Sequence, residues 1–327
     1  MSGNELTRRD FLRAAGVAAS AAALSACAPM PASPASAPAP TEPAYKIPRR
    51  ALGNTGWLLS VVGFGGIVVM NEMPDDAKAL VAKAIERGIN YFDVAPSYGN
   101  AQERLGPALE PYRKDVFLAC KTQQRTKASA EAELKRSLEL LRTDHFDVYQ
   151  FHAVTTQADV DAIFGPEGAM EAFLEAREKG QIRRIGFSAH SEAAALAMLD
   201  RFKFDTILYP VNWACWYGGN FGPKVIAKAQ EQGVAILALK ALAEQKWPAD
   251  AIKKWYKCWY QPLDTPEEVA LGLRFTLTKP VTAAVSPSHA ELLWMMCDAA
   301  EAFTPLSPAE EAKLAQMSKE VQPLFTA

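Results

Sequence analysis

Short apolar runs alternate with amphipathic segments from residue 60 onward. Each apolar run is rich in β-branched or aromatic residues and is bounded by turn or polar residues, which is typical of buried strands. In the segments between the runs, apolar residues recur every three or four positions, as they do along one face of a helix. The pattern predicts strands at 60–64, 90–94, 116–120, 147–151, 184–188, 206–209, 234–239 and 281–285.

The amphipathic segments predict the helices between these strands. Three of the segments end next to a glycine (Gly88, Gly180 and Gly233), and glycine commonly takes the left-handed conformation just beyond a helix. The predicted helices cover 75–87, 129–141, 168–179, 191–201, 223–232 and 266–278.

The regular alternation indicates an α/β protein. Eight units of strand then helix favour a parallel sheet closed into a (β/α)8 TIM barrel. A doubly wound open sheet is the alternative, but no Gly-x-Gly-x-x-Gly run follows any predicted strand. We therefore predict the closed barrel.

Composition narrows the class of protein. Of the 327 residues, 49% are hydrophobic and 22% are charged, which excludes a collagen-like or wholly disordered chain. The 35 Lys and Arg nearly balance the 37 Asp and Glu, so nucleic acid is not expected as a partner. There is no strongly apolar stretch long enough to predict a polytopic membrane protein.

The amino terminus resembles an export signal. Arg8 and Arg9 precede an apolar pair, and an alanine-rich run follows at 14–24, as in a twin-arginine signal peptide. The next residues, Leu-Ser-Ala-Cys ending at Cys27, are similar to a bacterial lipobox. We expect an exported protein on the periplasmic side, anchored to the membrane by lipid on Cys27. The alternative is a disordered tail with a chance cysteine.

A linker is predicted between this signal at 1–27 and the barrel domain at 45–327. Residues 28–44 are rich in Pro, Ala and Ser, a composition that favours extended polyproline II and cannot bury a core. We interpret the segment as a tether.

Four cysteines remain in the predicted barrel: Cys120, Cys215, Cys258 and Cys297. They form no Cys-x-x-Cys pair and have no histidine at a spacing suited to zinc, so we predict no metal site. Buried free thiols are favoured, although a disulfide would be permitted outside the cytoplasm.

Polar residues gather where the predicted strands end. Asp93 lies at the end of the second strand, Tyr98 in the loop after it, and Lys121 and His152 directly after the third and fourth. Each residue alone also has a purely structural interpretation. The aspartate can cap a helix, the tyrosine can pack, the lysine can be exposed, and the histidine can be a hydrogen-bonded core residue. Because barrels carry their chemistry at the carboxyl ends of their strands, the four together predict an active site.

Several motifs resemble the aldo-keto reductase family. The run GINYFDVAPSYG at 88–99 is similar to its most diagnostic motif, and LGNTG at 52–56 followed by VGFGG at 62–66 resembles its amino-terminal β-hairpin and first strand. DVYQFH at 147–152 and IRRIGFS at 182–188 are similar to its fourth and fifth strand segments. The resemblance runs from about residue 48 to 290, and it places the family's catalytic tetrad on Asp93, Tyr98, Lys121 and His152.

The chemistry of such a tetrad follows from its groups. Reducing a carbonyl by hydride transfer builds charge on oxygen, and Tyr98 is the expected proton donor. A neighbouring Lys121 ammonium is expected to lower the pKa of the phenol, with Asp93 as the partner of the lysine. His152 would orient the carbonyl and stabilise the developing oxyanion. No side chain supplies a hydride, so a cofactor, NADP or NAD, is implied.

Cofactor contacts are implied by the resemblance at eight residues, but the chain departs from the family's pattern around them. Leu208 and Leu239 stand where the family usually has a glutamine and a stacking aromatic, and the segment after the eighth strand lacks the usual arginine. Lys240 is expected either to compensate by contacting a phosphate or to be solvated at the rim. The eight residues are Gly65, Gly66, Ser188, His190, Asn212, Lys240, Ser286 and Ser288.

Aromatic residues cluster after the sixth and seventh strands. Such rings are candidate walls for a substrate, and a hydrophobic cluster that packs the loops is the alternative. We take Trp213 and Trp216 as the substrate residues; the other rings are Tyr217, Trp255, Tyr256, Trp259 and Tyr260. Two functions remain open. The first is an NAD(P)-dependent oxidoreductase that reduces an aldehyde, ketone or sugar carbonyl. The second is a non-catalytic or cofactor-divergent barrel, anchored at the membrane, that binds a ligand or partner.

Overall fold

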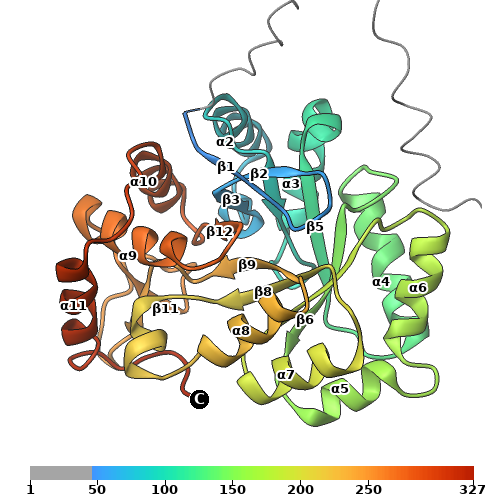
Figure 1. Ribbon diagram of the computed structural model, residues 1–327. Helices are drawn as coiled ribbons and strands as arrows, with labels where there is room; N and C mark the ends of the chain where they lie inside the picture. The colour runs from blue at the N-terminus through green and yellow to red at the C-terminus, as the bar shows by residue number, and fades with distance from the viewer. Residues whose placement is uncertain (1–45) are drawn as a thin grey trace, which may run out of the picture. The chain divides into compact units, whose positions relative to one another are not determined.

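Eight parallel strands close into a barrel with helices packed around it (Figure 1). The computed structural model describes residues 46–327, so the predicted signal peptide, Cys27 and the linker lie outside the described residues. The predicted (β/α)8 fold is confirmed. Around the barrel the strands run in the order β12 (Ala283–Val285), β3 (Val62–Gly65), β4 (Tyr91–Asp93), β5 (Phe117–Thr122), β6 (Val148–Val154), β7 (Ile185–Ala189), β8 (Thr206–Pro210) and β9 (Ala235–Leu239).

The six predicted helices each lie within two residues of an observed one. They are α2 (Pro74–Glu86), α4 (Lys127–Leu140), α6 (Ala169–Glu178), α7 (Glu192–Arg201), α8 (Pro223–Glu231) and α9 (Pro266–Thr278). The structure adds four helices outside those predictions: α3 (Ala101–Leu109), α5 (Gln157–Phe164), α10 (Ala290–Glu301) and α11 (Pro308–Met317). Short helical turns also occur at η1 (Gly66–Val69), η2 (Glu110–Asp115) and η3 (Ala214–Gly218).

Three helices end as the glycine pattern predicts. Gly88, Gly180 and Gly233 follow α2, α6 and α8 with φ values of 93°, 72° and 69°. Glycine adopts this left-handed conformation without the steric cost that a Cβ imposes. At each of these glycines the chain therefore leaves the helix and turns toward the next strand.

An antiparallel hairpin precedes the barrel. β1 (Arg49–Ala51) pairs with β2 (Leu58–Ser60), as the resemblance implied. Leu52 and Leu59 are fully buried in a cluster with Tyr91 and Phe117, and the Trp57 ring contacts Phe117 edge-on at 5.6 Å. The hairpin thus plugs the end of the barrel at which the strands begin, opposite the predicted site.

A second hairpin follows β9. β10 (Ala243–Lys246) pairs with β11 (Tyr260–Pro262), and the loop between them is fastened to two other segments of the barrel. Lys257 forms a 2.7 Å ion pair with Glu72 and donates to the Val68 carbonyl, while Cys258 Sγ lies 2.9 Å from Ser288 Oγ. The loop therefore crosses from β9 to the segments after β3 and β12.

The four cysteines of the described residues are buried and free. The compartment expected from the amino terminus would permit a disulfide, but none joins these thiols. The interpretation as buried thiols is confirmed for residues 46–327.

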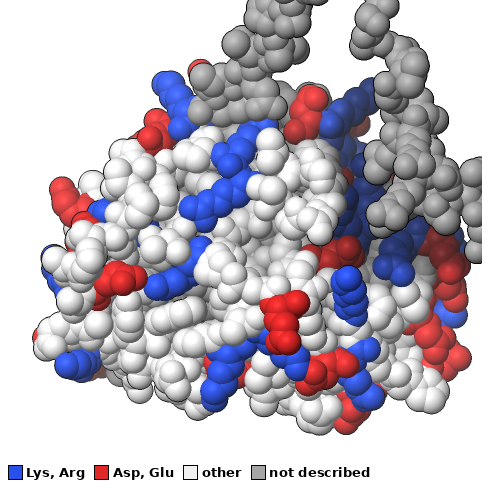
Figure 2. Space-filling model, viewed as in Figure 1, with Lys and Arg blue, Asp and Glu red and all other residues white. Residues whose placement is uncertain are grey.

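Charged side chains are spread over the surface. Figure 2 shows Lys and Arg interspersed with Asp and Glu around a largely uncharged central region. Within residues 46–327, no helix combines the length and the apolar character needed to cross a bilayer.

Candidate active site

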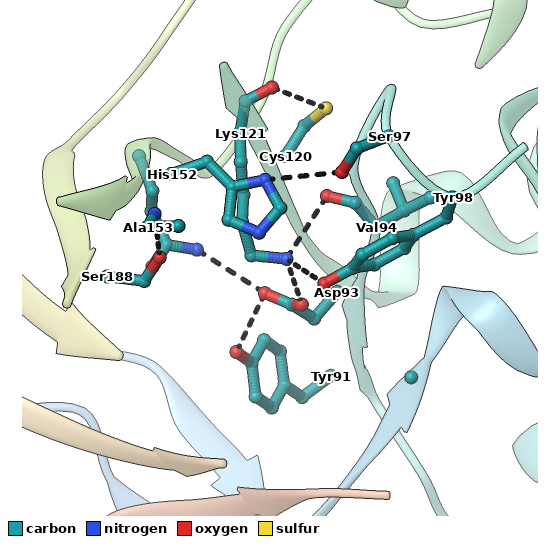
Figure 3. Close-up of polar contacts among 12 residues, drawn as sticks. Tyr91, Asp93, Val94, Ser97, Tyr98, Cys120, Lys121, His152, Ala153 and Ser188 are labelled. Carbon is teal, nitrogen blue, oxygen red and sulfur yellow. Dashed lines mark hydrogen bonds and ion pairs between the residues drawn. The ribbon is translucent and has the colours of Figure 1, made fainter. Parts of the chain in front are cut away.

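Asp93, Lys121 and Tyr98 form a buried chain of polar contacts (Figure 3). Asp93 ends β4 and Lys121 lies on the adjacent β5, where their side chains form an ion pair. Lys121 Nζ also donates to Tyr98 Oη at 3.3 Å and to the Val94 carbonyl at 3.4 Å. Both members of the ion pair are almost inaccessible to solvent, with Asp93 2% exposed and Lys121 fully buried.

The other oxygen of Asp93 is held by two residues that the sequence analysis did not single out. Tyr91 Oη and Gln150 Nε2 each donate to Oδ2 at 3.3 Å. Alternate residues of a strand point to the same side, which explains Tyr91, and Gln150 lies opposite Lys121 in the β5–β6 register. The sequence contained a signal for both residues, because Tyr91 and Gln150 each lie two positions before a predicted site residue, Asp93 and His152.

Glycine makes room for the Tyr91 ring. A Cβ at Gly63 on β3 would lie 2.5 Å from Tyr91 Cδ1, well inside van der Waals contact. Gly63, in the VGFGG run, therefore contributes to the site indirectly, because the space beside it holds the Tyr91 ring in reach of Asp93.

Lys121 remains charged in this environment. Burial alone would lower its pKa, but Asp93, by charge and hydrogen bond, and Tyr98 more than offset this and raise the pKa above its ordinary value. A buried charge is tolerable only when it is paired and hydrogen-bonded, and Lys121 is both. The site thus contains a permanent ammonium beside the phenol.

The pKa of Tyr98 differs in direction from the sequence expectation. Burial raises the pKa of the phenol, and the charge of Asp93 adds to the rise, whereas Lys121 opposes it by charge and by hydrogen bond. The net pKa is raised, because desolvation of the phenolate outweighs the lysine. Tyr98 is therefore a protonated phenol at neutral pH, the form that a proton donor needs.

His152 lies on a bulge of β6. The pairing of β6 with β7 shifts between Phe151 and Val154, and Ala153 takes a left-handed φ of 53°. Ser188 Oγ accepts a hydrogen bond from the backbone N–H of Ala153 at 2.8 Å. The His152 carbonyl accepts from Arg125 at 2.8 Å. These contacts fix the backbone that carries the imidazole.

The His152 imidazole is neutral. Burial lowers its pKa well below the ordinary value, and the charges of Lys121, Lys240 and Arg125 add to the effect. Its Nδ1 lies 3.4 Å from Ser97 Oγ, and its ring meets the Tyr98 ring edge-on at 5.8 Å. Figure 3 shows the imidazole, the phenol and the Lys121 ammonium converging. A neutral imidazole can donate one hydrogen bond to a carbonyl oxygen.

A pocket opens beside these groups. Its empty volume, which includes space open to solvent, is about 660 Å³. Four of the eight predicted cofactor residues line it: Gly65, Lys240, Ser286 and Ser288. The rest of the lining is Ile67, Asp93, Tyr98, Leu208, Leu239, Lys257, Cys258, Trp259, Tyr260, Val285 and Pro287.

The other four predicted cofactor residues lie outside this lining. Ser188 Oγ accepts the hydrogen bond from the Ala153 N–H. Asn212 is buried and its Oδ1 accepts from the Cys215 N–H at the start of η3. Gly66 packs closely on Val94, and His190 lies behind Lys240, with its Nε2 3.2 Å from Lys240 Nζ.

The predicted substrate residues also lie away from the pocket lining. Trp213 is completely buried. Trp216 packs edge-on against Phe275 at 6.1 Å, with the Lys279 ammonium over its ring. These placements agree with the packing alternative. The pocket is lined by Trp259 and Tyr260, two of the candidate aromatic residues after the seventh barrel strand.

A family model matches the barrel over residues 62–258 and is described as Aldo/keto reductase family. The chain belongs to this family. The matched region includes Asp93, Tyr98, Lys121 and His152, whose side chains lie together in the structure (Figure 3).

Individual relatives are more distant. The "Uncharacterized oxidoreductase YqkF" of Bacillus subtilis is 34% identical over 155 residues, which cover 43% of this chain and 48% of the relative. L-galactose dehydrogenase of Arabidopsis thaliana is 32% identical over 215 residues, covering 61% and 66%. The chain thus spans about half to two thirds of the length of these curated relatives.

A solved structure supports the fold over a longer span. The holo form of aldo-keto reductase AKR11C1 from Bacillus halodurans aligns with a TM-score of 0.65 at 23% identity, covering 86% of this chain and 98% of that one. At this identity the likeness concerns the fold.

Proposed function

We propose that this protein is an oxidoreductase that reduces a small-molecule carbonyl, with NADP or NAD as hydride donor and Tyr98 as general acid. The observation that carries the proposal is the placement of Tyr98. Its hydroxyl lies 3.3 Å from a charged, ion-paired Lys121, and the residue lines the pocket. A protonated phenol beside a pocket is suited to protonating an oxygen on which charge develops.

Each tetrad member has a separate task in this proposal. Lys121 stabilises the phenolate that remains after Tyr98 gives up its proton. Asp93 keeps the lysine charged and fixes its position, with Tyr91 and Gln150 holding the second carboxylate oxygen. His152 is neutral and orients the carbonyl by hydrogen bonding.

The pocket residues fit the nicotinamide end of such a nucleotide. The pocket joins Tyr98 to an apolar and aromatic wall that includes Leu239 and Trp259, against which a flat ring can pack. A Cβ at Gly65 would lie 2.6 Å from the Ser286 carbonyl, so the strand ends approach closely there. When bound, the nucleotide supplies the hydride that no side chain can supply.

The substrate is proposed only as a class. The name of the Arabidopsis relative refers to a sugar, and the family and the tetrad chemistry suit an aldehyde, a ketone or a sugar carbonyl. The apolar part of the lining favours a substrate with an uncharged body next to its carbonyl group.

A second candidate is a barrel that binds a ligand without reducing it. It is favoured by the side chains near Lys240, where a histidine contacts the lysine and the carboxyl-terminal Phe325 stacks on that histidine at 5.3 Å. In this alternative the pocket does not bind nicotinamide, because Leu208 and Leu239 replace the glutamine and the aromatic residue that usually contact it. The anchored protein then binds another ligand or a partner.

Nucleotide titration and turnover together distinguish the two candidates. NADPH and NADH are added to the purified protein, and tryptophan fluorescence is followed because Trp259 lines the pocket. We expect saturable quenching, carbonyl-dependent nucleotide oxidation, and a loss of turnover of about 10²-fold or more in Tyr98→Phe with little change in nucleotide affinity. Tyr217→Phe is the control, since it removes a phenol hydroxyl from a residue that packs on Phe275 and does not line the pocket. No binding of either nucleotide at millimolar concentration would favour the second candidate.

We also propose that the protein is exported by its twin-arginine signal and anchored by lipid on Cys27 at the periplasmic side of the membrane. The proposal rests on the order of the arginine pair, the alanine-rich run and the lipobox in the sequence.

A further inference from the structure

Lys240, which is partly buried, differs from the two buried lysines near the pocket. Lys121 and Lys257 each form an ion pair, with Asp93 and Glu72 respectively. Within residues 46–327, no carboxylate lies at ion-pair distance from Lys240. Its Nζ instead lies 3.2 Å from His190 Nε2 and 5.5 Å from the centre of the Trp259 ring.

The surroundings of this amine favour its neutral form. Burial lowers the pKa of Lys240 to about 7, with the charge of Lys121 on β5 adding to the effect and Cys215 on η3 opposing it. Burial also lowers the pKa of His190 well below the ordinary value, so its imidazole is neutral and adds no charge beside the amine. The other titratable groups that line the same pocket are Asp93, Tyr98, Lys257, Cys258 and Tyr260. His152 on β6 lies outside the lining but is close enough for Lys240 to affect its pKa.

Lys240 is also accessible from the pocket. It directly follows β9 with a left-handed φ of 63° and lines the same cavity as Tyr98. A desolvated lysine that lies near another cationic group and opens to a cavity is the arrangement by which proteins activate amines as nucleophiles.

We propose that Lys240 is a second reactive group of this pocket, an amine nucleophile that captures aldehydes as an imine. The apolar lining formed by Leu239, Trp259 and Val285 suits aldehydes with an aromatic or aliphatic body. The reaction uses the pocket of the proposed function but neither its nucleotide nor its hydride transfer.

The step balances without an oxidant or reductant. The lone pair of Nζ forms a bond to the carbonyl carbon, the C=O pair moves to oxygen, and a proton passes from nitrogen to that oxygen to give a carbinolamine. Loss of the hydroxyl as water, with the second N–H proton, leaves the C=N bond. One aldehyde and one amine thus give one imine and one water. His190 Nε2, at 3.2 Å from Nζ, is placed to accept and return the proton.

Reductive trapping tests the proposal on the unmodified protein. Full-length protein without nucleotide is incubated with benzaldehyde and sodium cyanoborohydride, and modified lysines are mapped by peptide mass spectrometry. At pH 7 we expect Lys240 to be labelled at least about tenfold faster than Lys246, an exposed lysine on the neighbouring hairpin. Lys121 and Lys257, paired with carboxylates, should remain unlabelled.

The pH dependence provides a second readout. The ratio of Lys240 to Lys246 labelling cancels the pH dependence of the reductant. It should fall by about tenfold or more between pH 7 and pH 9, because Lys240, with a pKa of about 7, has little free amine left to gain over this range, whereas an ordinary solvent-exposed ammonium still gains it. Lys240→Arg should lose the adduct. Labelling of Lys240 no faster than Lys246 at pH 7, or a ratio independent of pH, would overturn the proposal while leaving the reductase proposal intact.

Discussion

Ser188 Oγ accepts a hydrogen bond from the Ala153 N–H at 2.8 Å, directly behind His152. This contact holds the point at which the β6–β7 pairing shifts and the backbone takes a left-handed turn. Ser188 therefore positions the imidazole through the backbone. The resemblance suggested a contact to the cofactor, whereas the geometry indicates a contact to the neighbouring strand.

Ser188→Ala should lower turnover rather than nucleotide affinity. Losing the acceptor leaves the Ala153 N–H unsatisfied and lets His152 shift, and small misplacements of an orienting group are costly. We expect kcat to fall about tenfold, with the nucleotide Kd changed less than about twofold. Steady-state kinetics and fluorescence titration measure the two effects separately.

Ser60→Ala is the matched control for that variant. Ser60 is also a buried serine bonded to backbone and lies at the opposite end of the barrel. Both variants should lose about 1 kcal/mol of unfolding free energy, but only Ser188→Ala should lose turnover. An increase in nucleotide Kd with unchanged kcat would instead place Ser188 on the cofactor.

Asp93→Asn should destabilise the fold strongly at neutral pH. Removing one member of a buried ion pair leaves an uncompensated charge on Lys121, at a cost of about 3–5 kcal/mol. Urea unfolding at pH 7 measures the loss. Asp93→Asn combined with Lys121→Met should recover part of it, and a double variant less stable than the single one would contradict this account.

The cost of Asp93→Asn should shrink as the pH rises. In the parent the pKa of Lys121 is raised, so its stabilising contribution is complete below the unfolded pKa of about 10.4 and is lost only above it. In the variant the unpaired lysine loses its proton on folding, so stability increases with pH up to about 10.4. The difference between the two proteins should therefore be smaller at pH 9.5 than at pH 7.

Tyr98 should not limit carbonyl reduction between pH 7 and pH 9. Its pKa is raised by burial and Asp93 against the opposing effect of Lys121, so the phenol remains protonated throughout this range. Alcohol oxidation needs the phenolate, and its kcat should keep rising to pH 10. Both directions are measured in the parent and in Lys240→Met, which lacks the group that titrates near pH 7. A reductive kcat that falls with a midpoint below pH 9 in both proteins would be inconsistent with this assignment.

The protein should discriminate weakly between NADPH and NADH. No arginine lines the described pocket, and a charge-assisted contact to the 2′-phosphate is worth about 1.5–3 kcal/mol, or about 10- to 100-fold in affinity. We expect the two dissociation constants to lie within about tenfold of each other. Lys240→Ala should leave their ratio unchanged, because Lys240 shares its pocket with Tyr98 at the reacting end of the nucleotide. Selective weakening of NADPH would place Lys240 on the 2′-phosphate.

Cys27→Ala should release the protein from the membrane fraction without changing its thermal unfolding. The lipobox ends at Cys27, and the barrel begins well after it along the chain. Cell fractionation with a carbonate wash and a melting curve check the two expectations. A variant that stays in the washed membranes would contradict the lipid anchor.

The alternation of strands and helices was determined by the sequence alone. Burial periodicity is local, so the runs at 90–94 and 206–209 identify β4 and β8 without knowledge of their partners. The left-handed Gly88 and Gly180 are likewise local, because only the backbone conformation after a helix is involved. The resemblance placed the tetrad on Asp93, Tyr98, Lys121 and His152, and barrel geometry indicated that polar residues at and just beyond strand ends should lie together.

Only the tertiary structure decided how those residues behave. The pKa of Tyr98 depends on the balance between desolvation and the Lys121 charge, and that balance is set by how β5 lies beside β4 and the segment that follows it. Lys240 has no carboxylate at ion-pair distance within residues 46–327, and this depends on which distant segments pack around it. Trp213 is buried where its sequence position allowed a pocket wall. Ser188 and Ala153 are 35 residues apart and meet only because β6 and β7 pair with a shifted register. Such contacts are set by how the barrel closes, because closure determines which distant strand ends become neighbours.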